Sequence, residues 1–446
     1  MSMTGRQHDS ENTPARDGDS IAQDSQPAAA STGSQSGSNS GLTSGPASAP
    51  GTGPASRATR SGLEAEAALW RRRLAGWMGQ PFRGGNRIEP LRNGREIFPP
   101  MLQAIEEAER SIEFLTYVYW TGEIAEGFAT ALAEAAGRGV QVRVLLDGFG
   151  AKPMPEACLN QLRDGGVEVR WFRPLKLAKL WRLDNRTHRK VLVVDGRIGF
   201  TGGVGIAQEW EGDARDTSEW RDNHFRLQGP AVDALRAAFV GNWCDAGGAL
   251  DPRLDFPEAE TPGESEILPL RATGGPGWSD IATVVRVLVQ EAQQRLWLSS
   301  PYFLPDAQIR EGLCAAARRG VDVQVMVPGH YGDMRLAGMA YVSECECLVE
   351  AGVKVWLYQR TMLHIKQLLV DDTLSLLGSA NINQRSLSKD DEMAMCVIDP
   401  TLQSRLARDF EDDRGHCEAF DLERWRRRSW LRRLVEAIVK RFRPQL

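Results

Sequence analysis

The stretch that decides the fold is His188-Arg-Lys-Val-Leu-Val-Val-Asp195, and it occurs a second time as His364-Ile-Lys-Gln-Leu-Leu-Val-Asp371. Both copies read His-x-Lys-x4-Asp, and their histidines are 176 residues apart. The whole chain of 446 residues contains only six histidines. A pattern of such rare residues that occurs twice predicts a duplicated structural unit.

The spacing inside each copy has a chemical consequence. Residues i and i+2 of a strand point to the same face, so each histidine and its lysine are expected to face one site. Two imidazoles suit displacement at phosphorus, where one attacks and the other protonates the departing alkoxide. Two lysines suit the phosphate oxygens. We therefore predict a catalytic set from both copies: His188, Lys190, Asp195, His364, Lys366 and Asp371. The alternative, two hydrogen-bonded core histidines, suits a single histidine better than a duplicated set.

The segments around the two copies also repeat. Apolar runs at 111–120, 139–147 and 166–172 are matched by runs at 295–303, 320–327 and 352–358, and an alanine-rich helical stretch follows the first run of each set. Nearly continuous apolar strands that alternate with helices predict two α/β units with buried sheets. The alternative is that Gly-Val-x-Val recurs only because turns from helix to strand often look alike.

Composition excludes several classes of protein. The seven cysteines are odd in number, scattered and without a Cys-x-x-Cys pair, which argues against a disulfide scaffold and a zinc site. The net charge of −5 combines +8 over residues 424–446, −1 over residues 1–60 and −12 over the rest. An acidic body with a cationic end favours a membrane surface as partner over a nucleic acid strand.

The two ends of the chain differ from its middle. Residues 1–62, rich in Gly, Ser, Pro and Ala, are predicted to be a disordered leader without the pattern of a secretory signal. No run is apolar and long enough to span a membrane. Residues 424–446 predict a basic amphipathic helix, with Trp425 and Trp430 at interfacial depth, that lies on a membrane. The alternative is that its apolar stripe packs on the body of the protein.

Beyond the two motifs, further residues carry a resemblance. Gly378-Ser379-Ala-Asn381 and Glu392 follow the second copy, while Gly202-Gly203-Val-Gly205 and Trp220-Arg-Asp222 follow the first. With these segments the chain resembles the phospholipase D superfamily over residues 88–420, and within it the bacterial cardiolipin synthases. The resemblance implies that Ser379 and Asn381 contact phosphate or hold a lysine, and that Asp222 and Glu392 each accept a histidine N–H.

The resemblance also implies an architecture. We expect two homologous phospholipase D-like α/β/α sandwich halves, at residues 63–260 and 261–423, with the active site at their interface. Two departures stand out. Gly205 occupies a position where family members usually have Asn, which argues against equal roles for the two lysines. The two membrane-spanning helices that begin the family's common form are absent, which suggests a peripheral protein.

The activity implied by the resemblance is a phosphatidyltransferase that forms cardiolipin from two phosphatidylglycerol molecules through a phosphatidyl-histidine, with His188 favoured as nucleophile. We expect no cofactor, no metal and no nucleic acid partner. Anionic phospholipids and the cytoplasmic side of the bacterial inner membrane are the expected partners and location. The alternatives are a phospholipase D that passes the intermediate to water, a nuclease, and an inactive lipid-binding protein.

Three further candidates carry weaker signals. His224 could lie near the pocket, although a structural or surface histidine is favoured. Cys345 and Cys347, two apart on a predicted helix, face different directions and are interpreted as ordinary residues. The basic cluster before the first motif could contact lipid headgroups or form a solvated surface; it comprises Lys176, Lys179, Arg182 and Arg186.

Overall fold

The computed structural model describes residues 59–174, 185–250, 256–275, 279–332 and 344–427. All of them belong to one compact unit. Of the predicted leader, residues 1–58 lie outside the described residues, and so do Lys176, Lys179, Arg182 and the end of the C-terminal segment from residue 428.

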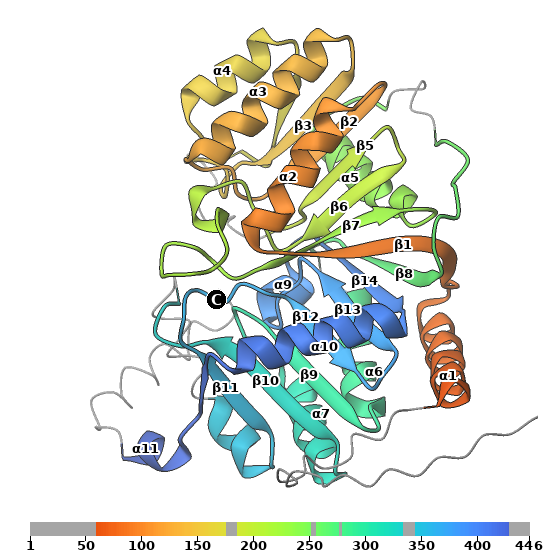
Figure 1. Ribbon diagram of the computed structural model, residues 1–446, viewed down its shortest axis with the longest axis vertical. Helices are drawn as coiled ribbons and strands as arrows, with labels where there is room; N and C mark the ends of the chain where they lie inside the picture. The colour runs from red at the N-terminus through yellow and green to blue at the C-terminus, as the bar shows by residue number, and fades with distance from the viewer. Residues whose placement is uncertain (1–58, 175–184, 251–255, 276–278, 333–343, 428–446) are drawn as a thin grey trace, which may run out of the picture. The chain divides into compact units, whose positions relative to one another are not determined.

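The first half contributes seven strands to a mixed sheet (Figure 1). In spatial order they are β1 (Arg83–Arg92), β7 (Asn223–Gln228), β6 (Ile198–Gly202), β5 (Val191–Val194), β2 (Ser111–Thr116), β3 (Gln141–Asp147) and β4 (Glu168–Phe172). Its helices are α2 (Asn93–Glu106), α3 (Glu123–Gly137), α4 (Glu156–Asp164) and α5 (Val232–Asp245), with a 3-10 turn at Gln208–Trp210.

The second half repeats this order across the junction between β1 and β8. Its strands are β8 (Ser265–Ala272), β14 (Glu392–Ile398), β13 (Leu374–Gly378), β12 (Gln367–Val370), β9 (Arg295–Ser299), β10 (Asp322–Pro328), β11 (Lys354–Tyr358) and an added β15 (Cys417–Ala419). Its helices include α6 (Asp280–Glu291), α7 (Ala307–Arg318), α9 (Gln384–Ser388), α10 (Pro400–Arg414) and α11 (Leu422–Arg426). The predicted duplication of an α/β unit is confirmed.

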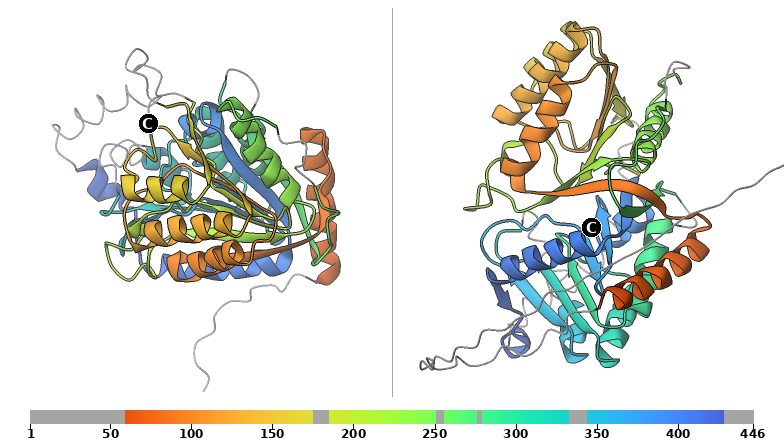
Figure 2. Two further views of the ribbon diagram at one scale, coloured as in Figure 1. Left: turned by 90° about the horizontal axis from the view of Figure 1, so that it is seen from above. Right: turned by 45° about the vertical axis from the view of Figure 1, so that its right-hand side comes forward.

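Figure 2 shows helices packed on the faces of the sheet. Three apolar cores hold these layers together. One lies under α2, α3 and α4 of the first half, and a second lies under α6 and α7 of the second half. The third core lies under α5 and α10 and draws strand residues from both halves, including Phe225 and Met395. The two halves therefore share buried apolar surface, which fixes the strands that carry the two motifs.

The N-terminal helix lies on a different half from the one predicted for it. α1 (Arg60–Met78) begins within the predicted leader, and its residues from 63 onward were assigned to the first half. Trp70 and Leu74 of α1 are instead buried in the core of the second half, and Arg71 forms an ion pair of 2.5 Å with Glu266. Arg73 of α1 also pairs with Glu291, the last residue of α6, at 2.5 Å, so the helix is held on the second half by contacts between segments far apart in sequence.

The described part of the C-terminal segment lies against the body. Trp425, predicted to sit at interfacial depth, is buried with its ring centroid 5.8 Å from that of Phe420. Arg426 forms ion pairs with Glu346 and Glu350. For these residues the packing alternative holds. Across the described ranges, no helix has the length and apolarity needed to cross a membrane.

Candidate functional site

The two His-x-Lys sequences lie directly before equivalent strands, β5 and β12. Lys190 Nζ donates to the His188 carbonyl oxygen at 2.8 Å, and Lys366 Nζ donates to the His364 carbonyl oxygen at 2.5 Å. Arg189, between His188 and Lys190, points to the other side and donates to the Asn242 side chain. The alternation expected of a strand is therefore present in both motifs.

Each histidine is paired with a carboxylate from the opposite half. His188 Nδ1 lies 3.0 Å from Glu392 Oε1, and His364 Nδ1 lies 2.6 Å from Asp222 Oδ2. A carboxylate at Nδ1 favours the proton there and leaves Nε2 as the acceptor nitrogen of the ring. In His364 this nitrogen lies 3.2 Å from Lys366 Nζ. The predicted roles of Asp222 and Glu392 as histidine partners agree with these contacts, and the site lies where the halves meet.

Main-chain hydrogen bonds reinforce this crossing of the halves. The His188 N–H donates to the carbonyl oxygen of Asp391 at 2.9 Å, and the His364 N–H donates to that of Arg221 at 2.7 Å. Asp391 and Arg221 each precede the carboxylate that binds the histidine. Each imidazole and its acceptor are therefore held by two adjacent contacts.

Ser379 has a different contact from the one predicted, while the role predicted for Asn381 remains a prediction. Ser379 was expected to contact phosphate or hold a lysine, but its hydroxyl donates to Glu392 Oε2, and Ser386 donates to the other oxygen. Both hydroxyls therefore orient the carboxylate that binds His188. Asn381 Oδ1 is buried and has no hydrogen-bond partner among the described residues. Ser386 was not predicted as a site residue because a serine within a short helix carries no distinct sequence signal.

Glycines replace these side chains in the first half for a steric reason. A Cβ on Gly203, the residue equivalent to Ser379, would lie 2.3 Å from Asp222 Oδ1. A Cβ on Gly205 would lie 2.6 Å from the Cβ of Val118. The position of the usual family Asn is therefore filled by Val118, which supports the predicted difference between the surroundings of Lys190 and Lys366.

Aromatic residues surround the two histidines unequally. The rings of Trp210, Trp220 and Tyr302 have centroids 5.2, 5.4 and 6.4 Å from that of His364. The ring of Tyr117 lies 5.1 Å from that of His188, with Lys190 Nζ 5.3 Å above it. Sequence reasoning did not assign these aromatic residues to the site, since they come from separate loops.

Burial sets the charge state of the site. It lowers the pKa of His364 to about 3, with the nearby Lys366 adding to the effect. Burial also lowers the pKa of His188 and brings that of Lys190 down to about 7. Burial alone would raise the pKa of Glu392, but its hydrogen bonds with His188 and Ser379 and the nearby charge of Lys190 lower it to about 2. The resting site therefore holds neutral imidazoles beside ionised carboxylates.

Asp195 and Asp371, predicted as members of the catalytic set, bind main-chain N–H groups and make no hydrogen bond or ion pair with either histidine among the described residues, which favours a structural role for both. They lie at the far ends of β5 and β12, where Asp195 accepts the main-chain N–H groups of residues 109–111 and Asp371 those of residues 293–295. Four residues separate each aspartate from its lysine, and the strand carries it away. The spacing is repeated because the turn before β2 and before β9 needs the same acceptor.

The weaker candidates that fall in the described ranges are placed by the structure, and His224 lines a small cavity together with Lys190. His224 is buried in β7, where burial lowers its pKa to about 3. Cys345 is buried and Cys347 is exposed, as expected of ordinary residues two apart on a helix. Arg186, predicted to contact headgroups or face solvent, is instead buried and donates to the Arg173 carbonyl oxygen at 2.8 Å. In the described ranges, no group of three or more His, Cys, Asp or Glu could hold a metal ion.

Comparison with known proteins agrees with this geometry. The family described as "Cardiolipin synthase, PLD-like domain" matches residues 101–211 and 285–414, one segment in each half. Cardiolipin synthase 1 of Bacillus anthracis is 32% identical over 80% of this chain and 72% of its own length. The cardiolipin synthase of Geobacillus kaustophilus is 33% identical over 84% of this chain and 75% of its own length.

A solved structure supports the fold. The phosphatidylserine synthase of Haemophilus influenzae superposes with a TM-score of 0.61 at 17% identity, over 84% of this chain and 97% of that one. This likeness concerns the fold alone, while the sequence matches concern the family. The chain therefore belongs to the cardiolipin synthase family of the phospholipase D superfamily.

Proposed function

We propose that this protein is a phosphatidyltransferase that joins two phosphatidylglycerol molecules into cardiolipin and releases glycerol. The observation that carries the proposal is the pair of crossed histidine–carboxylate contacts, His188 with Glu392 and His364 with Asp222. Two equivalent imidazoles on one interface suit a reaction with two successive displacements at one phosphorus atom. Membership of the cardiolipin synthase family supports the choice of substrate.

In the first step, Nε2 of His188 attacks the phosphorus atom of the donor. A P–N bond forms, the bond from phosphorus to the glycerol headgroup oxygen breaks, and protonated His364 gives that oxygen its proton. Since Lys190 and Lys366 lower the pKa of His364 in the empty site, an anionic phosphate that offsets their charge raises it again. Substrate binding thereby favours the protonated form of His364, which acts as the general acid.

In the second step, a hydroxyl of another phosphatidylglycerol attacks the phosphatidyl-histidine. Neutral His364 accepts the hydroxyl proton, a P–O bond forms and the P–N bond to His188 breaks. One phosphodiester replaces another, so the reaction needs no nucleotide. Lys190 and Lys366 balance the charge that the phosphate oxygens carry in both steps.

Product analysis tests the proposal against a phospholipase D. Purified protein with phosphatidylglycerol vesicles should yield cardiolipin and glycerol in equal amounts. Phosphatidic acid and glycerol without cardiolipin would show that water is the acceptor. A His188→Ala/His364→Ala variant supplies the background, and a parallel reaction in EDTA should keep its rate, since the lysines carry the charge.

The substrates also bear on location. We propose that the protein acts as a peripheral protein on the cytoplasmic face of the bacterial inner membrane, because its substrates are bilayer lipids. The test is fractionation of cells followed by a high-salt wash of the membranes. Recovery in the wash supports peripheral attachment, and retention after the wash contradicts it.

A further inference from the structure

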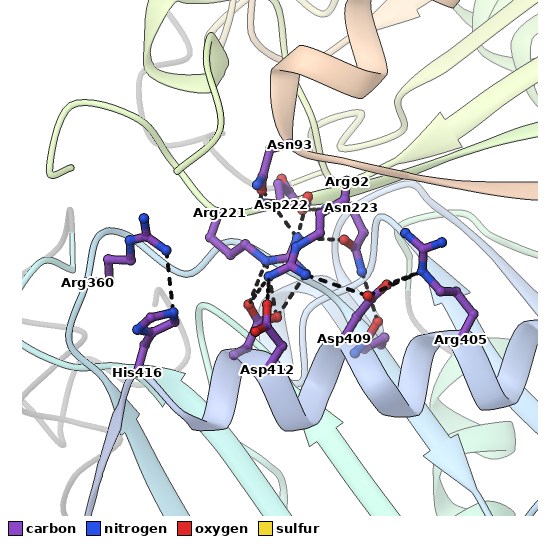
Figure 3. Close-up of polar contacts among 12 residues, drawn as sticks. Arg92, Asn93, Arg221, Asp222, Asn223, Arg360, Arg405, Asp409, Asp412 and His416 are labelled. Carbon is purple, nitrogen blue, oxygen red and sulfur yellow. Dashed lines mark hydrogen bonds and ion pairs between the residues drawn. The ribbon is translucent and has the colours of Figure 1, made fainter. Parts of the chain in front are cut away.

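A buried ion pair joins the first half to α10 next to the carboxylate that binds His364. The side chains of Arg221 and Asp413 are each only 1% exposed. Arg221 donates from Nε to Asp413 Oδ1 at 2.9 Å and from Nη2 to Oδ2 at 2.8 Å. Figure 3 shows Arg221 above α10, with Asn93, Asp222 and Asn223 on its far side. A bidentate pair of this kind fixes orientation as well as distance.

The third guanidinium nitrogen of Arg221 holds the chain that carries the carboxylate. Nη1 donates to the main-chain oxygen of Asp222 at 2.8 Å and to the Asn223 side chain at 2.7 Å. Asn223 in turn donates to Gln367, the neighbour of Lys366, at 3.1 Å. The main chain of Arg221 also accepts the His364 N–H. One residue thus contacts both partners of the His364–Asp222 pair.

We propose that Arg221, anchored by Asp413, is a positioning residue that holds the Asp222 carboxylate in line with His364 Nδ1. It touches neither substrate nor the reacting atoms, and it acts through Asp222. The inference rests on the proposed function in one respect, since it requires His364 to take part in turnover.

The equivalent contact at His188 is built differently. Asp391, which occupies the place of Arg221, accepts from Asn242 on α5 at 2.5 Å and from the N–H of Gly274 at 2.7 Å. A different guanidinium binds the Glu392 main chain there: Arg189 Nε donates to the Glu392 carbonyl oxygen at 3.2 Å, and its other nitrogens donate to Asn242 and to main-chain oxygens, not to a carboxylate. Two serine hydroxyls also hold the Glu392 carboxylate. Disturbing Arg221 should therefore affect the His364 side of the site alone.

The test separates positioning from fold stability with two variants. Asp413→Asn leaves the buried guanidinium without its counter-charge, so we expect a lower melting temperature and lower activity. The double variant Arg221→Gln/Asp413→Asn removes both charges of the pair. Arg92, which also binds Asp413 at 3.1 Å, keeps its ion pairs with Asp409 and Asp412, so the melting temperature should return towards that of the wild type. Its kcat should nevertheless stay about 10- to 100-fold low with KM little changed. The Trp210 Nε1–H and the Asn223 N–H still bind the Asp222 carboxylate, but the main chain that carries it has lost its contacts with Arg221, so the carboxylate is less well aligned with His364.

Asp412→Asn is the matched control. Asp412 is the neighbour of Asp413 on α10 and pairs with Arg92 at 2.5 Å, but its side chain is 58% exposed and does not contact Arg221. This variant should keep the wild-type kcat. Since the Asp222 hydrogen bond supports the protonated form of His364, the alkaline limb of kcat should also move to lower pH in the double variant alone.

Recovery of both melting temperature and kcat in the double variant would show that the pair serves stability only and would overturn the inference. Rates are measured as total phosphatidylglycerol consumed. They therefore still decide the role of Arg221 if the wild type forms phosphatidic acid instead of cardiolipin, an outcome that would contradict only the proposed acceptor.

Discussion

His188 and His364 occupy equivalent positions, yet each has a task that the other cannot take over within one step. We predict that His188→Ala and His364→Ala each abolish cardiolipin formation while the melting temperature stays close to that of the wild type. The side chain of His188 is 12% exposed and that of His364 is 7% exposed. This difference supports His188 as the nucleophile.

Mapping the covalent adduct checks this assignment. Rapid quenching followed by peptide mass spectrometry should find the phosphatidyl group on His188. An adduct on His364 would reverse the two roles. Circular dichroism of both alanine variants provides the control for folding.

Lys190 gives the site a predicted pH dependence. Burial lowers its pKa to about 7, so the ammonium is present below that pH and is lost above it. We therefore expect kcat/KM, which reports the free enzyme, to fall as the pH rises through about 7. The corresponding fall of kcat should occur at a higher pH, because the bound phosphate anion stabilises the Lys190 ammonium.

The Lys190→Arg variant tests the source of this limb. A guanidinium remains protonated throughout the range, so the limb at neutral pH should disappear from whatever activity remains. Lys366→Arg is the control and should retain it. An unchanged limb in Lys190→Arg would assign the titration to another group.

For the individual residues of the site, the sequence predicted which groups react but not how they are paired. His188, Lys190, His364 and Lys366 were readable because a strand period of two fixes their common face. The crossing of Glu392 to His188 could not be read, since it depends on contact between halves about 200 residues apart in sequence. Residue chemistry predicts candidates, and only the fold pairs them.

Among the elements, the turns before β2 and β9 explain the aspartates of the motif. Asp371 accepts N–H groups from residues 293–295 and has a left-handed φ of 49°. Asp371→Ala would leave those donors unpaired at a cost of about 1–3 kcal/mol. It would also put an alanine in the left-handed region, at a further cost of roughly 1 kcal/mol.

We predict a lower melting temperature for Asp371→Ala with kcat of the folded enzyme unchanged. Asp371→Asn keeps one acceptor oxygen and tolerates the left-handed conformation, so its loss of stability should be smaller. Thermal denaturation and initial rates at low temperature measure the two effects. A large fall in kcat at full stability would restore a catalytic role for the aspartate.

Periodicity predicted the strands well and the assignment of α1 poorly. Strands such as β3 and β10 bury both faces, so their apolar runs are visible in the sequence. Helix α1 presents only a narrow apolar stripe around Trp70 and Leu74, which shows that it packs but not on which half. The destination of a terminal helix is a tertiary property that a local pattern does not contain.

For the whole molecule, duplication and crossing have one consequence. Because each half supplies the carboxylate for the histidine of the other half, neither half has a complete histidine–carboxylate pair of its own. The shared core under α5 and α10 is therefore a requirement of the site as well as of stability. The two halves can therefore differ in detail without losing the site. Gly205 stands where the second half has Asn381, so the surroundings of Lys190 and Lys366 differ, yet the shared core still holds both histidine–carboxylate pairs together.

The remaining prediction at this scale concerns attachment to the membrane. Residues 428–446 carry six basic residues and one glutamate, a net charge of +5, and lie outside the described residues. Each basic residue near an anionic leaflet contributes about 1 kcal/mol to binding. Truncation after Arg427 keeps the buried Trp425 and the ion pairs of Arg426, so the body should remain folded.

We expect this truncation to weaken binding to phosphatidylglycerol vesicles, with the difference from the full chain shrinking as salt is added. Turnover of phosphatidylglycerol in detergent micelles should persist, because the residues of the site all precede the cut. Neutral phosphatidylcholine vesicles are the control and should bind both proteins weakly. Unfolding, aggregation or loss of micellar turnover would contradict the prediction and would mean that the apolar stripe of 428–446 packs on the body, as Trp425 does.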